Sequence, residues 1–214
     1  MDRFGLIGYP ISHSESPALF RKAYGGKWEY DLIEERDFGA ARDRFIKGPY
    51  KAVNVTAPFK KQAVLAADIL SGEVKAIGAA NILVKTEEGI AAHNSDYLAL
   101  LRLLPRSNGG KAAVIGLGGA GLAAAQAVRT LGYEVECRHH DEIAKGLAAD
   151  LIIYTLPCAV DGCRRLECGI LVEANYKNPC LNGHKGYISG REWLRCQALE
   201  GYTLMTGEEP RRDF

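Results

Sequence analysis

The sequence predicts an α/β protein of two domains. Short apolar segments of strand length alternate with helix-length segments along most of the 214 residues, an order typical of parallel sheets covered by helices. Residues 107–110 (SNGG) have the composition of a linker or hinge. After this stretch the alternation becomes more compact, so we expect a parallel sheet on each side of it.

The first domain is expected to open with a strand and then a helix that Ser16 caps. Ser is a favoured N-cap residue, and Pro17 fits the first helical position. The other elements are predicted from apolar spacing and from turn residues. In chain order, the first domain has strands at 4–8, 28–33 and 52–56, helices at 16–23, 37–47 and 60–70, a hairpin at 81–92, and a helix from Asp96 to Leu104.

The second half is expected to contain the same two kinds of element in closer succession. An apolar run at 111–115 has the length of a buried strand and precedes an Ala-rich helical segment at 119–131. The remaining elements are strands at 133–137, 151–154 and 170–172 and helices at 142–148 and 191–199.

Composition and charge exclude several classes of protein. The formal net charge is +1 and basic residues are spread along the chain, so no nucleic-acid-binding surface is expected. No apolar run approaches the ~20 residues that span a bilayer, and the first residues lack a signal-peptide pattern, so we expect a cytoplasmic protein with no membrane partner. The six cysteines form no CxxC pair, which favours free thiols and no metal site.

A glycine motif indicates that the second domain binds a dinucleotide. Residues 116–121 (GLGGAG) directly follow the apolar strand and open the Ala-rich helix, which is the setting that a GxGxxG motif requires. Gly116 allows the tight turn, Gly118 lets the backbone approach a pyrophosphate, and Gly121 allows close packing of helix on strand. The N–H groups that begin the helix would then face the phosphates.

The end of the next strand indicates which dinucleotide binds. An NAD site usually places an acidic residue there to accept from the ribose 2′-OH, whereas this chain has residues 137–140 (CRHH). The guanidinium of Arg138 can hold a 2′-phosphate through two N–H groups, which favours NADP. Glu136 is the alternative if the strand register differs, and Arg138 would then be an ordinary loop residue.

The first domain carries polar motifs at strand ends, where ligands of open α/β sheets gather. Residues 8–17 (GYPISHSESP) put several hydroxyls beside a helix N-terminus, an arrangement that suits a carboxylate. Residues 54–60 (NVTAPFK) end on a lysine that can donate a proton to a ketone oxygen. Residues 78–81 (GAAN) and 94–97 (NSDY) add amide and carboxyl groups. Taken singly, these residues would be helix caps and surface charge, so the interpretation depends on their occurring together.

Together and in this order, the motifs GxPxxHSxSP, NVTxPxK, GAxN and NxD, followed by GxGxxG, resemble those of the shikimate dehydrogenase family. Residues 173–176 (EANY) are similar to the acidic-x-x-Tyr motif of that family. Residues 190–197 (GREWLRCQ) are similar to its closing Gly-x-x-Met-Leu-x-x-Gln, with Trp193 in place of Met. The resemblance covers nearly the whole chain.

The resemblance implies a two-domain oxidoreductase. Residues 1–98 with 189–214 would form an α/β substrate-binding domain, with the C-terminal helix packed back on it, and residues 99–188 an NADP-binding Rossmann domain. The implied reaction is the reduction of 3-dehydroshikimate to shikimate by NADPH, a step of the shikimate pathway of aromatic amino-acid biosynthesis. The partner would be this small-molecule substrate, and the protein a monomer or homodimer.

The resemblance also implies a role for each matching residue. Ser14 and Ser16 would bind the substrate carboxylate, Lys60 and Asp96 would form the catalytic pair, and Tyr176 would line the pocket. The residues that would hold the ring hydroxyls are Thr56, Asn81, Asp96 and Gln197. The residues that would contact the cofactor are Gly116, Gly118, Gly119, Ala120, Gly121 and Arg138.

Three departures from the family leave alternatives open, and all three concern the cofactor side. The chain is short between residues 138 and 151, residues 154–159 (YTLPCA) replace the usual Asn-Ala-Thr-x-x-Gly, and Trp193 replaces a Met that often lies against the nicotinamide. One alternative is a degenerate paralogue that binds NADP or another ligand without turnover, although the intact Lys60 and Asp96 favour the enzyme. Another is an enzyme that also accepts quinate, although the paired serines favour shikimate.

Overall fold

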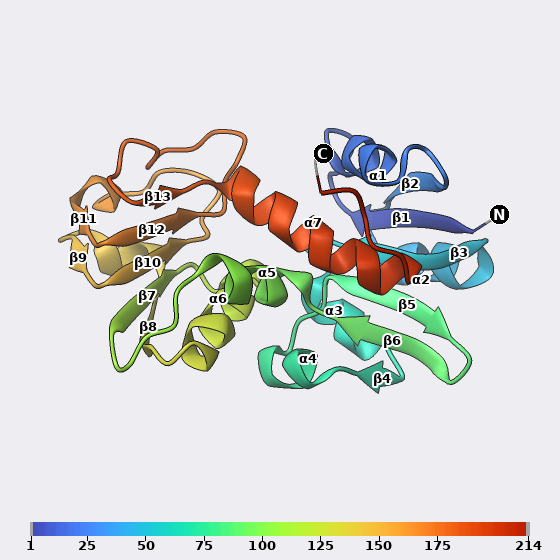
Figure 1. Ribbon diagram of the computed structural model, residues 1–214, viewed down its shortest axis with the longest axis horizontal. Coiled ribbons are helices and arrows are strands. Elements are labelled where there is room, and N and C mark those ends of the chain that lie inside the picture. Colours follow the sequence, from blue (N-terminus) through green and yellow to red (C-terminus); the bar gives the residue numbers. More distant parts are fainter. Residues whose placement is uncertain (1, 213–214) are drawn as a thin grey trace. The chain divides into compact units, whose positions relative to one another are not determined.

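The computed structural model describes residues 2–212 (Figure 1). The chain forms two compact units, in which residues 1–95 with 198–214 make unit 1 and residues 96–197 make unit 2. The chain enters unit 2 at the start of helix α5 (Ser95–Leu103) and leaves it within helix α7 (Gly190–Thr206). The predicted assignment of substrate to one domain and cofactor to the other stays a prediction.

Unit 1 contains one six-stranded sheet in the order β2-β1-β3-β5-β6-β4. Its strands are β1 (Arg3–Gly8), β2 (Glu29–Glu34), β3 (Tyr50–Val55), β4 (Ile69–Leu70), β5 (Ile82–Thr86) and β6 (Gly89–His93). Its helices are α1 (Ser16–Tyr24), α2 (Phe38–Lys47), α3 (Lys60–Leu65) and α4 (Gly72–Ile77), with the C-terminal part of α7. The predicted hairpin is confirmed as β5 and β6, which pair antiparallel.

The sheet of unit 1 is mixed, so the expectation of a parallel sheet in both halves is wrong for this unit. Strands β1, β2 and β3 are parallel, but β5 runs antiparallel to β3 and β6. Only Glu87 and Glu88 separate the two strands of the hairpin, too short a connection for the crossover that parallel neighbours need.

This topology brings the polar motifs to one edge of the sheet. Ile7 pairs with Val55 at the carboxyl ends of β1 and β3, so the loops that follow both strands leave from the same edge. Asn54 in turn faces Ile82 at the start of β5, and Ile82 faces His93 at the end of β6. The segments that follow or precede these four strand ends therefore meet there.

Two predicted elements of unit 1 are corrected. The helix expected at 60–70 ends at Leu65, and Ile69 and Leu70 pair with β6 instead. Asp68 directs this change, because its amide donates to Ile90 O (2.8 Å) and its Oδ2 accepts from Ile90 N (2.8 Å). Helix α1 begins at Ser16 itself, so Ser16 is its first residue and not its N-cap.

Unit 2 contains a five-stranded parallel sheet in the order β13-β12-β10-β7-β8 and a small parallel pair, β9 with β11. Its strands are β7 (Lys111–Ile115), β8 (Glu134–Arg138), β9 (Leu147–Ala148), β10 (Leu151–Tyr154), β11 (Leu166–Glu167), β12 (Ile170–Glu173) and β13 (Tyr187–Ile188). Its helices are α6 (Gly119–Thr130), most of α5, the first part of α7, and 3₁₀ turns at His140–Ile143 and Cys163–Arg165. The helix expected at 142–148 is wrong; a short 3₁₀ turn and β9 replace it.

The central strands of unit 2, β7, β10 and β12, are buried on both faces, which explains why they read as continuous apolar runs. Along β7 and β10, Val114 and Ile153 point into one core, which α6 also enters. Ile115 and Ile152 point into a second core on the opposite side. That second core is closed by the 3₁₀ turns and loops, so the shortened region after β8 still covers this face.

The C-terminal part of α7 completes the core of unit 1, as predicted. Tyr202 and Met205 are almost fully buried and pack with Phe4 and Phe20 of β1 and α1. The ring centroids of Phe20 and Tyr202 lie 5.0 Å apart in an edge-to-face arrangement. Within residues 2–212, no helix is both long enough and apolar enough to cross a membrane.

Candidate active site

The two predicted carboxylate-binding serines lie together at the start of α1. Ser14 Oγ donates to Ser16 Oγ (3.1 Å) and accepts from Ser16 N (3.2 Å). Glu15, which precedes the helix, makes no side-chain cap. Two half-buried hydroxyls beside a helix N-terminus can both donate to an anion, since each hydroxyl can rotate its hydrogen.

Polar side chains on the core side of the serine pair form a hydrogen-bond network, and the sequence prediction did not identify these contacts. Tyr30 OH donates to Asn54 Oδ1 (2.8 Å), and Asn54 Nδ2 donates to Asn81 O (3.4 Å). Burial raises the pKa of Tyr30 well above its ordinary value, so its hydroxyl keeps the proton it donates. Tyr202 OH reaches Ser16 O (3.5 Å). The usable signal was Asn54, a polar residue inside the apolar strand AVNV.

Lys60 is distinguished from its neighbour by burial. It is the first residue of α3 and is half-buried, whereas Lys61 is exposed. The turn before it is fixed by Thr56, whose amide donates to Ile7 O (2.8 Å) and whose carbonyl accepts from Phe59 N (3.0 Å). The Lys60 carbonyl also accepts from Ala80 N (2.8 Å), which ties this turn to the segment that carries Asn81.

Asn81 holds the segment that leads into α5. It is 3% exposed, its Oδ1 accepts from Ser95 N (2.8 Å), and its Nδ2 donates to Ser95 Oγ (3.1 Å). The amide side chain therefore fixes the residue directly before Asp96. Its predicted contact with a ring hydroxyl stays a prediction.

Glu73 in α4 supports the same segment through a charged hydrogen bond. Its Oε1 accepts from Asn94 N (3.4 Å) and lies 3.8 Å from His93 Nδ1. Burial alone would raise the pKa of Glu73, but hydrogen bonds from His93 and from backbone amides outweigh it and lower the pKa to about 2.

Glu73→Gln should weaken the acid dependence of stability. Because the folded-state pKa is depressed, the contribution of the carboxylate is complete above its ordinary value of 4.5 and is lost as the pH falls toward about 2. Urea denaturation at a series of pH values between about 5 and 2 should give a flatter free-energy curve for the variant. Glu88→Gln, in the exposed hairpin turn, is the control. An unchanged slope in Glu73→Gln would contradict this role.

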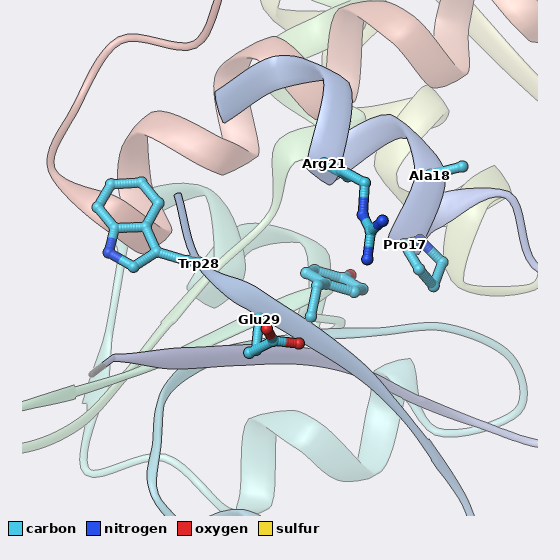
Figure 2. A pocket seen from close by; sticks show the side chains of 6 residues that line it. Pro17, Ala18, Arg21, Trp28 and Glu29 are labelled. Carbon is cyan, nitrogen blue, oxygen red and sulfur yellow. The ribbon is translucent and has the colours of Figure 1, made fainter. Parts of the chain in front are cut away.

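A cavity of about 310 Å³ lies next to the serine pair, between α1 and the edge strand β2 (Figure 2). Its lining residues are Pro17, Ala18, Arg21, Trp28, Glu29 and Tyr30. None of the predicted site residues lines it. Tyr30 connects it to the polar cluster, because the same side chain donates to Asn54.

The glycine loop of unit 2 has the geometry that its motif predicts. Gly116 has a φ of 91°, which only glycine adopts readily, and a Cβ at Gly121 would lie 1.9 Å from Gly116 O. A Cβ at Gly118 would meet nothing within 4 Å. The packing of the protein thus requires two of the glycines, while Gly118 leaves open space before the helix.

This open space fits a dinucleotide pyrophosphate. Gly118 precedes the 12-residue helix α6, and the first N–H groups of a helix have no partners within it. The N–H groups of Gly119 and Ala120 would donate to the phosphates, and the absence of a side chain at Gly118 would leave room for them. Gly118 is exposed, whereas Gly116 and Gly121 are buried.

Thr155, which the sequence prediction did not select, braces this loop, and Asn175, also not selected, braces the loop that follows Thr155. Thr155 Oγ1 donates to Ile115 O (3.0 Å) and Gly116 O (3.1 Å). Asn175 Nδ2 donates to Pro157 O (2.7 Å), joining the loops that follow β10 and β12. The sequence 154–159, which departs from the family, therefore still supports the glycine turn by its own contacts.

Glu173 anchors the segment that carries Tyr176. Its carboxylate is fully buried and accepts from Cys180 N (2.7 Å), Leu181 N (3.2 Å) and Tyr187 OH (2.9 Å). Burial raises the pKa of Cys180 to about 12, and the neighbouring carboxylate adds to the shift, so this thiol stays protonated. Glu173 is thus a structural residue beneath the loop.

The remaining predicted residues all belong to unit 2. Asp96 is 8% exposed, and its carbonyl accepts from Trp193 Nε1 (3.2 Å), so the buried Trp193 joins α7 to α5. Tyr176 and Gln197 are half-buried. Lys60 and Asp96 fall in different units, and their proximity stays a prediction. Arg138 ends β8 beside the carboxylates of Glu136 and Glu142.

Comparison with known proteins agrees with these motifs. Residues 6–83 match the family model of the shikimate dehydrogenase substrate binding domain. Shikimate dehydrogenase (NADP(+)) of Aeropyrum pernix is 39% identical over 138 residues, which cover 62% of this chain and 50% of that protein. The enzyme of the same name from Acidiphilium cryptum is 35% identical over 164 residues, which cover 72% of this chain and 59% of that protein. The chain thus spans about half the length of the curated relatives it matches.

The fold matches solved structures over nearly the whole chain. Shikimate 5-dehydrogenase from Thermus thermophilus, in complex with shikimate, superposes with a TM-score of 0.84 at 25% identity, covering 99% of this chain and 95% of that one. Shikimate dehydrogenase of Mycobacterium tuberculosis gives a TM-score of 0.80 at 25% identity, covering 100% and 96%. The matched N-terminal domain holds the paired serines, Lys60 and Asn81. Residues 6–83 thus carry the substrate-binding domain of the shikimate dehydrogenase family, and the fold of the chain is that of solved shikimate dehydrogenases.

Proposed function

We propose that this protein catalyses the NADPH-dependent reduction of 3-dehydroshikimate to shikimate. The observation that carries the proposal is the gathering of the paired serines, the Thr56–Lys60 turn and Asn81 at one edge of the unit 1 sheet. The glycine loop of unit 2 supports the cofactor half of the proposal. The two curated relatives compared above carry the name NADP(+)-dependent shikimate dehydrogenase, which names the substrate and the cofactor.

In the proposed mechanism the protein orients the ketone and moves one proton. Hydride would come from the reduced nicotinamide when it is bound. Ser14 and Ser16 hold the carboxylate, Lys60 donates a proton to the oxygen of the former ketone, and Asp96 accepts a hydrogen bond from a neighbouring ring hydroxyl. Thr56, Asn81 and Gln197 would hold the other hydroxyls, with Tyr176 against the ring.

Steady-state turnover tests the proposal. The purified protein is incubated with NADP and shikimate, then with NADP and quinate, and NADPH formation is followed by its absorbance. Turnover with shikimate is expected, and slower turnover or none with quinate, because the serine pair suits the smaller acid. NADP binding without turnover of either acid would favour a degenerate paralogue that only binds its ligand.

Ser14→Ala should raise the KM for shikimate more than it lowers kcat. A carboxylate far from the reacting carbon is bound about equally in the ground and transition states, so its loss appears mainly in KM. Loss of one hydrogen bond to a charged group costs about 1.5–3 kcal/mol of binding free energy, which would raise KM roughly 10- to 100-fold. Ser12→Ala, at an exposed position two residues earlier, is the matched control. Equal KM values in the two variants would show that Ser14 does not bind the substrate carboxylate.

A further inference from the structure

Arg138 is held between two carboxylates at the end of β8. Its Nη2 is in direct contact with Glu136 Oε1, and its Nη1 lies 3.5 Å from Glu142 Oε1. The sequence offered Arg138 and Glu136 as alternative contacts for the ribose. In the structure the side chains of Arg138 and Glu136 contact each other, and the carboxylate of Glu142 lies on the other terminal nitrogen of Arg138.

Local geometry fixes this arrangement. Glu136 and Arg138 are two residues apart on β8, so their side chains project from the same face of the strand. Glu142 lies in the 3₁₀ turn that follows, and its Oε2 accepts from His139 N (2.6 Å). Glu142 is therefore anchored to the backbone beside the guanidinium that it faces.

The two carboxylates already face the N–H groups of Arg138 that a 2′-phosphate would use. A guanidinium binds phosphate through two parallel N–H groups, and here each terminal nitrogen already faces a carboxylate. The side chains of Glu136 and Glu142 are 50% and 41% exposed. Glu136 can swing into solvent, whereas Glu142 must also break its bond with His139 N to do so. A 2′-phosphate must therefore displace at least one of them and then lie near its negative charge.

We propose that Glu136 and Glu142 set the cofactor selectivity of this protein by competing with the 2′-phosphate of NADP for Arg138. The inference rests on the proposed function only in requiring that the glycine loop bind a dinucleotide. NAD has a 2′-OH, which leaves the ion pairs intact and can itself donate to Glu136. The wild-type protein thus has a smaller preference for NADP than Arg138 alone would give.

Direct binding measurements test this without turnover. Dissociation constants for NADP, NAD and 2′,5′-ADP are measured by isothermal titration calorimetry for wild type, Glu136→Gln and Glu142→Gln. Because each ion pair is partly exposed, each variant should bind NADP and 2′,5′-ADP about twofold to fivefold more tightly. The gain should shrink at high salt. NAD affinity should stay the same or fall, most of all in Glu136→Gln.

Two further variants make the result specific. Glu134→Gln removes an exposed carboxylate at the start of the same strand and should change none of the three dissociation constants. In an Arg138→Ala background, Glu136→Gln should no longer lower the NADP dissociation constant, because the guanidinium for which carboxylate and phosphate compete is absent. Melting temperatures verify that every variant is folded.

The outcomes separate this inference from the proposed function. If NADP binds but the ratio of NAD to NADP dissociation constants is the same in wild type and both Gln variants, the competition proposed here is overturned. Equal tightening of both dinucleotides would also overturn it. If no variant and no wild-type protein binds either dinucleotide, the proposed function fails and this inference with it.

Discussion

Lys60→Met should lower kcat for shikimate oxidation by about 10²–10⁴-fold, the usual contribution of a positioned general acid or base. Methionine keeps the length of the side chain but has neither charge nor exchangeable proton. NADP affinity should survive, because Lys60 belongs to unit 1 and the glycine loop to unit 2. Steady-state kinetics with separate measurement of the NADP Kd distinguishes the two effects.

The adjacent lysine supplies the control for this experiment. Lys61 is exposed one residue further along α3, and Lys61→Met should leave kcat nearly unchanged. Lys60→Arg should not restore turnover, because a guanidinium with a pKa above ~12 does not release its proton near neutral pH. Near-normal kcat in Lys60→Met would reduce this residue to ordinary surface charge and refute the mechanism.

Gly121→Ala should destabilise unit 2 and abolish dinucleotide binding. The new Cβ would lie 1.9 Å from Gly116 O, which is a backbone atom that cannot rotate away. Overpacking of this kind costs about 1–3 kcal/mol, and the glycine turn must shift as well. A lower midpoint in urea denaturation, together with loss of NADP binding by calorimetry, is the expected result.

Gly118→Ala is the matched variant, because a Cβ there meets nothing within 4 Å. It should leave the urea midpoint nearly unchanged but weaken NADP, since the methyl group occupies the space reserved for the phosphates. Loss of one charge-assisted hydrogen bond would lower the affinity by about 10- to 100-fold. If Gly118→Ala binds NADP as wild type does, the pyrophosphate does not lie against this residue.

The strands could be predicted from the sequence where burial alone determines them. The runs 111–115 and 151–154 match β7 and β10 because both faces of this sheet are covered. The helix predicted at 60–70 failed for the opposite reason. Its second half is recruited to the sheet by the two hydrogen bonds between Asp68 and Ile90, and a partner so distant in sequence leaves no local signal.

In the candidate site, too, features with a local sequence signal could be predicted and those that depend on distant partners could not. The motifs identified Ser14, Ser16 and Lys60, because their residue types and positions at strand ends carry chemistry directly. The supporting contacts of Tyr30 and Asn175 depend on pairings across 24 and 18 residues, which spacing alone does not reveal. For Arg138, the sequence offered two alternatives, and only the side-chain geometry shows that they act on each other.

The discontinuous build of unit 1 has a consequence for how the chain is made. During synthesis from the N-terminus, unit 2 is complete once residue 197 has emerged, but unit 1 still lacks Tyr202 and Met205. Until then Phe4 and Phe20 lack the side chains that bury them, and apolar surface of this kind promotes aggregation. Unit 2 can therefore fold first on the ribosome, while unit 1, which holds the paired serines, waits for the C-terminal part of α7.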